Sequence, residues 1–259
     1  MQSTPCQSPP DNIRRIMNTF VLKIIAVISM LVDHTTYLFP EYIPYELRGI
    51  IGRIAFPLYA YLIAVGVEHT KSPLRYLFRL LLFAVISEPF FDLALKRGDI
   101  SYFRDTNIFF TLFLGACAIY VFKLIFDALN EDSWKKYFIW VALIPLPAFP
   151  LIANYIESDY RWYGVLFIIS FFFIRQIKNR YLKYFSLFTV TIAQYFVFIP
   201  MVFWVPRSLY QLSFIAGLLT ASVFLCLYNE KLGFNKAKWL FYIFYPGHLL
   251  ILYLIKMYI

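Results

Sequence analysis

The feature that most limits the fold of this chain is a series of apolar runs, most of them long enough to cross a lipid bilayer. A helix that spans the hydrocarbon core needs about 20 predominantly apolar residues. Charged and proline-containing breaks divide the 259 residues into nine such runs: 20–39, 50–67, 76–95, 107–126, 137–153, 162–174, 184–204, 209–228 and 239–259. We therefore expect an all-α, polytopic integral membrane protein with about nine transmembrane helices.

Composition supports this class. Hydrophobic residues make up 61% of the chain and charged residues 15%, which is more apolar surface than a soluble core of this size could bury. Backbone groups in lipid must be paired internally, and the runs lack the polar alternation of barrel strands. A lipid bilayer is thus the first partner that the sequence predicts.

The net charge of +9 resembles a nucleic-acid signal until the positions of the basic residues are compared with the apolar runs. Many of them lie at alternate ends of successive runs, in five groups: Arg14, Arg15 and Lys23; Lys71, Arg75 and Arg79; Lys123, Lys135 and Lys136; Arg175, Lys178, Arg180 and Lys183; Lys231, Lys236 and Lys238. The positive-inside rule places these groups in the cytoplasm. It predicts a cytoplasmic N-terminus and an external Ile259, and it leaves no reason to expect a nucleic-acid partner.

The remaining composition indicates one domain. Residues 1–16, with three prolines near the start, are predicted to be a disordered cytoplasmic tail, and no shift in composition or internal repeat divides residues 17–259. The first run is followed by Asp33 and His34 rather than by small residues, so it is predicted to be a retained helix and not a cleaved signal peptide. The three cysteines, Cys6, Cys117 and Cys226, lack metal-ligand spacing, and we expect neither a disulfide framework nor a metal site.

Ionisable residues inside the apolar runs are the first candidates for function, because each costs several kcal/mol in hydrocarbon. Asp33 and His34 end the first run, Glu88 and Asp92 lie in the third, and His248 lies in the last. The predicted topology puts Asp33, His34, Glu88 and Asp92 in the outer half of the membrane. We expect a polar cavity that opens toward the outside.

Each of these groups has a structural interpretation beside the functional one. Neighbours on a helix point about 100° apart, so Asp33 and His34 do not form a ready-made pair, and one of them must face another helix. His34 is either part of a polar helix end at the headgroup level or a base that lines a pocket. Glu88 and Asp92 are four residues apart and share one helix face, where they could act in catalysis or together bind a cation such as Arg53 or Arg104.

Two further histidines have different settings. His248 stands near the middle of the last run, next to a Pro246-Gly247 pair that we expect to break the helix, and it must find a partner on another helix. His69 precedes Lys71 and Arg75 at the cytoplasmic end of the second run. This cluster is either a solvated loop or a site for the phosphates of a nucleotide-bearing donor.

Six blocks in order resemble the TraX family of membrane proteins and cover roughly residues 17–259. The blocks are Leu22–Ala26 with Met30–His34, Leu47–Pro57, Arg79–Asp92, Asn107–Leu112, Asp159–Gly164 and Tyr245–Leu249.

The resemblance implies a membrane acyltransferase, and in particular an acetyltransferase. Such a protein would lie in the bacterial plasma (inner) membrane and move an acyl group from cytoplasmic acyl-CoA, with acetyl-CoA expected as co-substrate and no metal. The acceptor would be an extracytoplasmic peptide, glycan or small molecule with an amine or hydroxyl. The family's first-helix histidine is regarded as catalytic, which corresponds to His34.

Acyl transfer needs a base for the acceptor's proton and a donor of hydrogen bonds or positive charge for the carbonyl oxygen. We assign candidate roles accordingly. The catalytic candidates are His34 as the base, with Asp33, Glu88, Asp92 and His248 assisting. The candidates for contacts to the substrate are Arg53, Asn107, Asp159, Tyr163 and Tyr245. The candidates for binding acyl-CoA at the cytoplasmic mouth are His69, Lys71, Arg75 and Arg79.

Two other classes remain open. A small-solute or proton-coupled transporter would also hold carboxylates and histidines in its spans, but it would need access from both sides and often carries repeats. A scaffold for a surface apparatus would not explain ionisable groups on several different helices. Acyl transfer by the purified protein would separate the first class from both.

Overall fold

Helices form the framework of this protein in the computed structural model, which describes residues 16–96, 104–130, 143–202, 209–234 and 238–258. Within these ranges no strand occurs, although an isolated bridge pairs Met17 with Tyr228. Most of the predicted N-terminal tail, residues 1–15, lies outside the described residues.

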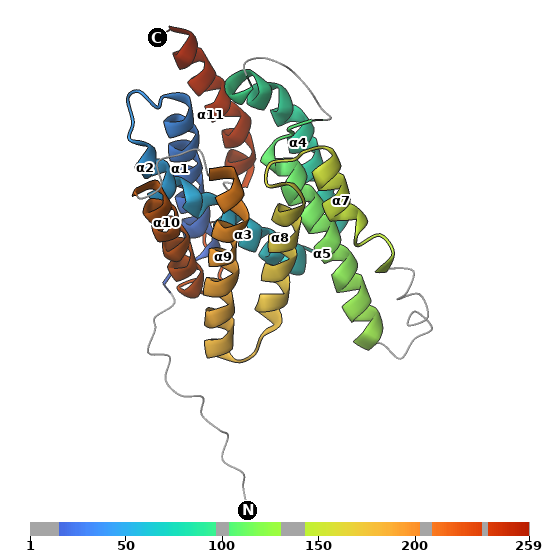
Figure 1. Ribbon diagram of the computed structural model, residues 1–259. Helices are drawn as coiled ribbons and strands as arrows, with labels where there is room; N and C mark the ends of the chain where they lie inside the picture. Colours follow the sequence, from blue (N-terminus) through green and yellow to red (C-terminus); the bar gives the residue numbers. More distant parts are fainter. Residues whose placement is uncertain (1–15, 97–103, 131–142, 203–208, 235–237, 259) are drawn as a thin grey trace, which may run out of the picture.

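The helices follow one another along the chain as Figure 1 labels them. In order they are α1 (Thr19–Leu38), α2 (Tyr45–Ile50), the 3-10 turn η1 (Gly52–Ile54), α3 (Ala55–His69), α4 (Pro73–Leu95), α5 (Ile108–Asn130), α7 (Ala148–Tyr155), α8 (Arg161–Gln176), α9 (Arg180–Val202), α10 (Leu209–Cys226) and α11 (Lys238–Tyr258). Among the described residues, four segments are long and apolar enough to cross a membrane: Thr19–Leu38, Tyr45–His69, Ile108–Leu129 and Trp239–Tyr258. The prediction of a helical membrane protein is confirmed in this form, while the number of spans and the side of the N-terminus stay predictions.

Two of the nine predicted runs differ from the helices that form. The second run begins in α2 and passes through η1 before α3 continues it, so its first residues are not part of one straight helix. The fifth run, 137–153, overlaps α7, which has 8 residues and is therefore only about 12 Å long. An element of that length does not cross a bilayer. Residues 137–142 lie outside the described part of the chain.

Local sequence explains how several helices begin. Asn18 caps α1, where its side-chain oxygen accepts a hydrogen bond from the Val21 amide at 3.0 Å, as N-cap residues commonly do. Pro73 opens α4 at a position where the missing amide hydrogen has no cost.

Proline does not end a helix in two other places. Pro89 lies inside α4 and Pro246 inside α11, so the predicted break at Pro246-Gly247 is wrong and His248 sits on a continuous helix.

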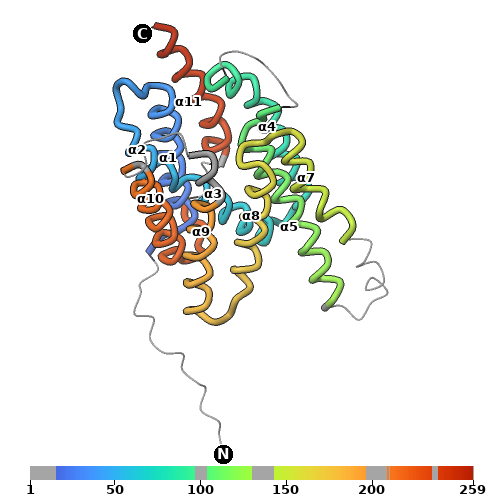
Figure 2. Tube along the Cα trace, viewed as in Figure 1, coloured from blue at the N-terminus to red at the C-terminus, as the bar shows by residue number. Residues whose placement is uncertain are grey.

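The helices form one bundle around α3 (Figures 1 and 2). In α3, 11 of the 15 residues are buried, because α1, α5 and α8 pack around it. On one side α11 lies against both α1 and α4, and α7 lies against α5 and α8. A helix surrounded in this way cannot face lipid along its length, so α3 forms the inner wall against which a site can be built.

The close contact of α2 with α10 depends on two glycines. A Cβ atom at Gly217 would stand 2.2 Å from the backbone oxygen of Gly49, and a Cβ at Gly49 would stand 2.0 Å from the side-chain oxygen of Ser213. Neither distance is possible between real atoms. Only glycine at both positions therefore allows α2 and α10 to pack this closely. The same packing holds Arg48, which α2 carries, close to Asp33 of α1.

Candidate active site

A cavity of about 350 Å³ runs along α3 and connects two groups of polar side chains. Its lining includes α3 residues from Ala55 to His69, a distance of about 21 Å along a helix. The histidine end of this central cavity is formed by Asp33, His34, Gly52 and Asp159, and its basic end by Lys23, His69, Thr70 and Arg79. A cavity of this volume that extends so far must be narrow, so it suits a thin, extended chain.

At the histidine end, α1 and α11 bring two histidines together. His34 Nδ1 lies 2.7 Å from His248 Nε2, and His248 Nδ1 lies 2.8 Å from the backbone oxygen of Phe244. The ring planes of the two histidines differ by 4° with centroids 5.0 Å apart. Both rings thus meet edge to edge, in line with the hydrogen bond, although 214 positions separate them in the chain.

Asp33 does not pair with its neighbour His34 but faces two arginines. Arg48 of α2 binds it through Nε at 3.1 Å, and Nη2 of Arg53 from η1 lies 3.5 Å from the same carboxylate. A Cβ atom at Gly52 would stand 2.7 Å from this carboxylate, so glycine is required for η1 to approach α1. The charge of Asp33 is therefore compensated, whereas one carboxylate facing two arginines leaves this cluster with a net positive charge.

The connection between α7 and α8 places Asp159 at the cavity. The Asp159 amide donates to the Thr106 carbonyl at 2.8 Å, and the Thr111 hydroxyl donates to the Asp159 carbonyl. Tyr160 follows with a positive φ of 65° and stacks on Phe56 with ring centroids 3.7 Å apart. These contacts fix a backbone conformation that side chains rarely adopt, and they hold both residues in the cavity wall.

Electrostatics distinguish Asp159 from an ordinary surface carboxylate. Its side chain is accessible from the cavity yet crowded by protein, and this desolvation raises its pKa to about 6. The negative charge of Asp33 acts in the same direction, while Arg53 and Arg48 oppose it. Near neutral pH the carboxyl group is thus mainly charged, and it becomes neutral under mildly acidic conditions.

Glu88 and Asp92 form a separate cluster that does not line the central cavity. Both are fully buried, and Lys96 lies 2.9 Å from Asp92 and 3.8 Å from Glu88. Glu88 also accepts the backbone amide of Asn107 at 2.9 Å. The cation that this carboxylate pair binds is Lys96 and neither Arg53 nor Arg104, which corrects the sequence-based expectation. The cluster fastens the end of α4 to the beginning of α5.

Asn107 is fully occupied by the same cluster. Its side-chain amide nitrogen donates to the Ala84 carbonyl at 2.7 Å and to Glu88 at 2.5 Å, and its oxygen accepts the Phe109 amide at 2.9 Å. It caps α5 rather than facing the cavity, so no hydrogen-bonding group remains for a substrate.

Tyr245 of α11 lines the cavity between the histidines and the start of α5. Its ring centroid lies 6.2 Å from that of His34 and 5.7 Å from that of His248. Among the described residues no group forms a hydrogen bond of normal geometry with its buried hydroxyl, although the Ile108 amide is directed toward it. An unsatisfied buried hydroxyl is uncommon and calls for an explanation.

The basic end differs in part from what the sequence suggested. His69 and Arg79 line the cavity as expected, whereas Lys71 and Arg75 are exposed and do not. Lys23 of α1 lines it as well, a residue that was predicted only as part of the first cytoplasmic basic group. Its ammonium group lies 5.4 Å from the centroid of the Phe241 ring.

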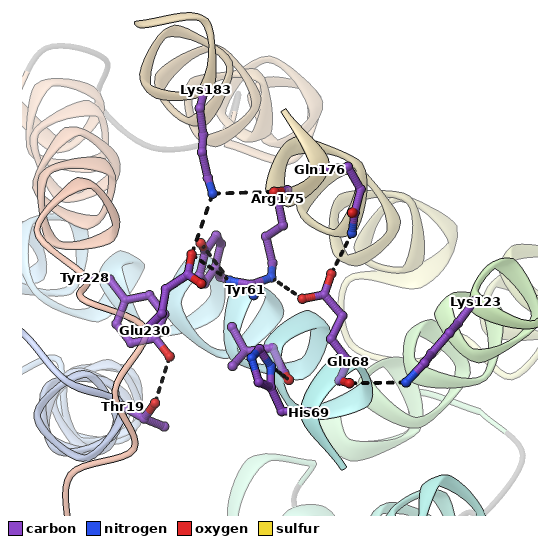
Figure 3. A network of polar contacts seen from close by, with 11 residues as sticks. Thr19, Tyr61, Glu68, His69, Lys123, Arg175, Gln176, Lys183, Tyr228 and Glu230 are labelled. Carbon is purple, nitrogen blue, oxygen red and sulfur yellow. Dashed lines mark hydrogen bonds and ion pairs between the residues drawn. The ribbon is translucent and has the colours of Figure 1, made fainter. Parts of the chain in front are cut away.

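A second polar network lies next to the basic end and joins four parts of the bundle (Figure 3). Glu68 of α3 accepts from Arg175 at 2.7 Å and from Gln176 at 2.8 Å, both on α8. Glu230, which follows α10, lies 3.6 Å from both Arg175 and Lys183. Its members are paired with one another, which indicates that this network fixes α8, α9 and the segment after α10 to α3.

Of the residues predicted to contact the substrate, Tyr163 does not line the central cavity but lies behind the residues that do. It is buried, and its ring packs edge-on against Tyr160 with centroids 6.2 Å apart. Arg48 and Tyr160 belong to the site but were not predicted. Arg48 lies outside the apolar runs, and nothing in the sequence indicates the positive φ of Tyr160.

In the part of the chain that the structure describes, no group of three potential metal ligands is close enough to hold an ion.

Comparisons with known proteins place the chain in a family. Residues 19–256 match the model of a family described as TraX protein. The chain is 28% identical over 256 residues to a probable fimbrial assembly protein, FimC of serogroup H1, from Dichelobacter nodosus. The aligned segment covers 93% of this chain and 97% of that protein. It is 34% identical over 104 residues to the uncharacterised protein RP591 of Rickettsia prowazekii (strain Madrid E), covering 40% of this chain and 37% of that one. No solved structure matches significantly.

Proposed function

The chain belongs to the TraX family, and on that premise we propose that it is a membrane acyltransferase. It transfers an acyl group, in the simplest case acetyl, from cytoplasmic acyl-CoA to an amine or hydroxyl at the outer side of the bacterial plasma (inner) membrane. The relative from Dichelobacter nodosus is described as a fimbrial assembly protein. That description favours an acceptor that belongs to a surface structure, such as an extracytoplasmic peptide.

The observation that carries the proposal is the central cavity, which joins a basic end to a histidine. Lys23 and Arg79 at the basic end suit the phosphates of CoA, since cations with several donors bind phosphate well. The narrow interior suits the extended arm that bears the thioester. His34 then meets the acyl carbon some 20 Å away along α3, a length taken from the helical rise.

The chemistry at the histidine end is a direct transfer. The acceptor's nitrogen or oxygen attacks the thioester carbon while His34 takes its proton, and the carbonyl oxygen gains negative charge. When the carbon–sulfur bond breaks, the CoA thiolate leaves and takes the proton from His34. The products are the acylated acceptor and CoA, and His34 returns to its initial state. An acyl-His34 intermediate would use the same groups in two steps.

The developing charge on the carbonyl oxygen requires a hydrogen-bond donor. Arg53 is held in the Asp33 cluster, and Asn107 is fully occupied. Tyr245 fits better, because its hydroxyl has no partner of normal geometry among the described residues and lies close to both histidines. Asp159, across the same end of the cavity, is suited to hold the acceptor.

The experiment uses purified protein in lipid nanodiscs with radiolabelled acetyl-CoA. Release of CoA thiol and transfer of label are measured with small amines and hydroxyl compounds as surrogate acceptors. We expect His34→Ala to lose at least about 100-fold in rate, since a general base contributes roughly that factor or more. Tyr228→Phe serves as the control, because it removes a buried hydroxyl that binds Thr19 and does not line the cavity.

Two results would contradict the proposal. Wild-type rates in His34→Ala would remove this histidine from the reaction. A wild-type protein that releases no CoA thiol, but exchanges a labelled solute across proteoliposomes, would favour a transporter instead. In cells, mass spectrometry of surface peptides and glycans with and without the protein identifies the acceptor by its acyl mass difference.

A further inference from the structure

We infer that His248 is a positioning residue that fixes the tautomer of His34. The inference rests on the proposed function for its catalytic meaning, but its structural content stands on the geometry of three groups: the Phe244 carbonyl, His248 and His34. A neutral histidine carries its proton on one ring nitrogen and a lone pair on the other. Which nitrogen is protonated follows from the hydrogen bonds around the ring.

The assignment begins at the Phe244 carbonyl, which can only accept. His248 Nδ1 lies 2.8 Å from it and must therefore donate, so this nitrogen carries the proton. In the neutral ring, His248 Nε2 then carries a lone pair and accepts. Its partner at 2.7 Å is His34 Nδ1, which must donate in turn. The proton of His34 is thus on Nδ1, and its lone pair is on Nε2.

This result matters because His34 lines the central cavity while its Nδ1 edge is occupied by His248. The remaining ring nitrogen is Nε2, the one that holds the lone pair. A base needs a lone pair directed at the proton that it removes. Without His248, His34 could place its proton on Nε2 and would then offer a donor where the reaction needs an acceptor.

The charged groups around the pair do not replace this control. Asp33, the carboxylate next to His34, is held by Arg48 and Arg53, and Asp159 reaches the cavity from the connection before α8. On the side of α11, the rings of Phe244 and Tyr245 flank His248. His248 takes the place that an aspartate occupies beside the histidine of a serine hydrolase, with a neutral ring and a carbonyl in place of the carboxylate.

The first test reads the tautomer and needs no turnover. Protein with ¹⁵N-labelled histidine is studied by NMR in nanodiscs, in a His69→Gln background so that two histidines remain, and His34→Ala assigns their signals. We expect His34 to show a protonated Nδ1 and a bare Nε2. A His34 that is protonated on Nε2, or that populates both tautomers equally, would overturn the inference even if acyl transfer is observed.

The second test uses a conservative pair of variants in the acyl-transfer assay. His248→Gln keeps an acceptor, its side-chain oxygen, near the position of Nε2, and we expect its kcat to stay within about 10-fold of wild type. His248→Phe keeps a ring of similar size but offers no acceptor, and we expect kcat to fall at least about 100-fold with little change in the KM for acetyl-CoA. Equal losses in both variants would assign His248 a packing role only and contradict the inference.

The two tests separate this inference from the proposed function. A protein that shows the expected tautomer but transfers no acyl group retains the His34–His248 assignment and refutes the acyltransferase. A protein that transfers acyl groups but shows the opposite tautomer refutes only the assignment made here.

Discussion

At the scale of single residues, the polar side chains that the helices bury divide into those that are paired and those that lack a partner of normal geometry among the described residues. Burying a polar group is unfavourable unless a partner compensates for the lost water. Asp33 has Arg48 and Arg53, and both Glu88 and Asp92 have Lys96. The Tyr245 hydroxyl has no comparable partner among the described residues. Because this hydroxyl lies beside the cavity, a ligand that completes its hydrogen bonding would explain it.

Tyr245→Phe removes this hydroxyl and leaves the ring. We expect kcat to fall about 100-fold, because the loss of one donor to a developing oxyanion has costs on that order. The KM for acetyl-CoA should change little, since the hydroxyl acts on charge that appears only during the reaction. Steady-state kinetics in nanodiscs measure both constants, with Tyr228→Phe as the control for loss of a buried hydroxyl. A kcat within 3-fold of wild type corresponds to a change of about 0.6 kcal/mol or less in the activation free energy. Such a small change would exclude Tyr245 from this role.

Asp159→Asn tests the electrostatics of the cavity through stability. The pKa of Asp159 is raised to about 6 by desolvation and by Asp33. A raised carboxyl pKa means that the folded protein binds the proton more tightly than the unfolded chain does. The resulting stability is present at low pH and is lost as pH rises through about 6.

Asparagine does not titrate, so the variant lacks this loss. We expect the Tm of Asp159→Asn minus that of wild type to increase between about pH 5 and about pH 7.5. Thermal unfolding in detergent, followed by intrinsic fluorescence at several pH values, measures the difference. Glu157→Gln removes a partly exposed carboxylate two residues earlier and controls for the change in charge. A difference that stays constant or shrinks over this range would contradict the assigned pKa.

At the scale of helices, much of the fold could be predicted from apolar runs, because length and hydropathy largely determine where a membrane helix forms. Helices α1, α4, α5, α8, α9, α10 and α11 lie within a few residues of the predicted runs. The division of the second run into α2, η1 and α3 could not be predicted, since it goes with a close approach of Gly49 to Gly217 on a helix far away in the sequence. The break predicted at Pro246 does not form, because α11 continues as a helix through this residue.

The candidate site was less predictable than the helices, because it depends on which helix faces meet. Nothing in the sequence indicates that His34 and His248, 214 positions apart, share a hydrogen bond. By contrast, the partner of Asp92 was visible in the sequence. Lys96 follows it by four residues, the spacing at which opposite charges pair on a helix. This spacing indicates Lys96 as the partner of Asp92 more directly than the position of any distant arginine does.

Gly217→Ala tests whether the contact of α2 with α10 holds the site. The new methyl group would lie 2.2 Å from the Gly49 oxygen, and backbone on both sides leaves it no room. We expect destabilisation of about 1–3 kcal/mol, typical of overpacking, together with a loss of activity as α2 and Arg48 move away from Asp33. Gly247→Ala on α11 is the matched control, since nothing lies within 4 Å of its Cβ position. The free energy of unfolding and the acyl-transfer rate are measured for both variants. Equal stability of Gly217→Ala and Gly247→Ala would show that the contact is not essential.

At the scale of the whole molecule, one narrow cavity connects two chemically different ends. The basic end suits a donor with phosphates, and the histidine end suits an acceptor with a nucleophile. If the donor is cytoplasmic, the two substrates enter from opposite faces of the membrane and meet inside the protein. Water is then kept from the thioester by the packed helices around α3. This arrangement requires that the connection between α1 and α2 be external and the connection between α8 and α9 be cytoplasmic.

Cysteine labelling tests that requirement directly. Glu41, between α1 and α2, and Lys178, between α8 and α9, are both exposed, and their connections lie at opposite ends of the bundle (Figure 1). Starting from a protein in which Cys6, Cys117 and Cys226 are replaced by serine, a single cysteine is placed at either position. We expect Glu41→Cys to react with a membrane-impermeant maleimide in intact cells whose outer membrane, where present, has been permeabilised. Lys178→Cys should react only after the inner membrane is opened, because the basic groups near it favour the cytoplasm. Labelling of Glu41→Cys from the cytoplasmic side alone would invert the topology, and the acceptor would then have to approach His34 from inside the cell.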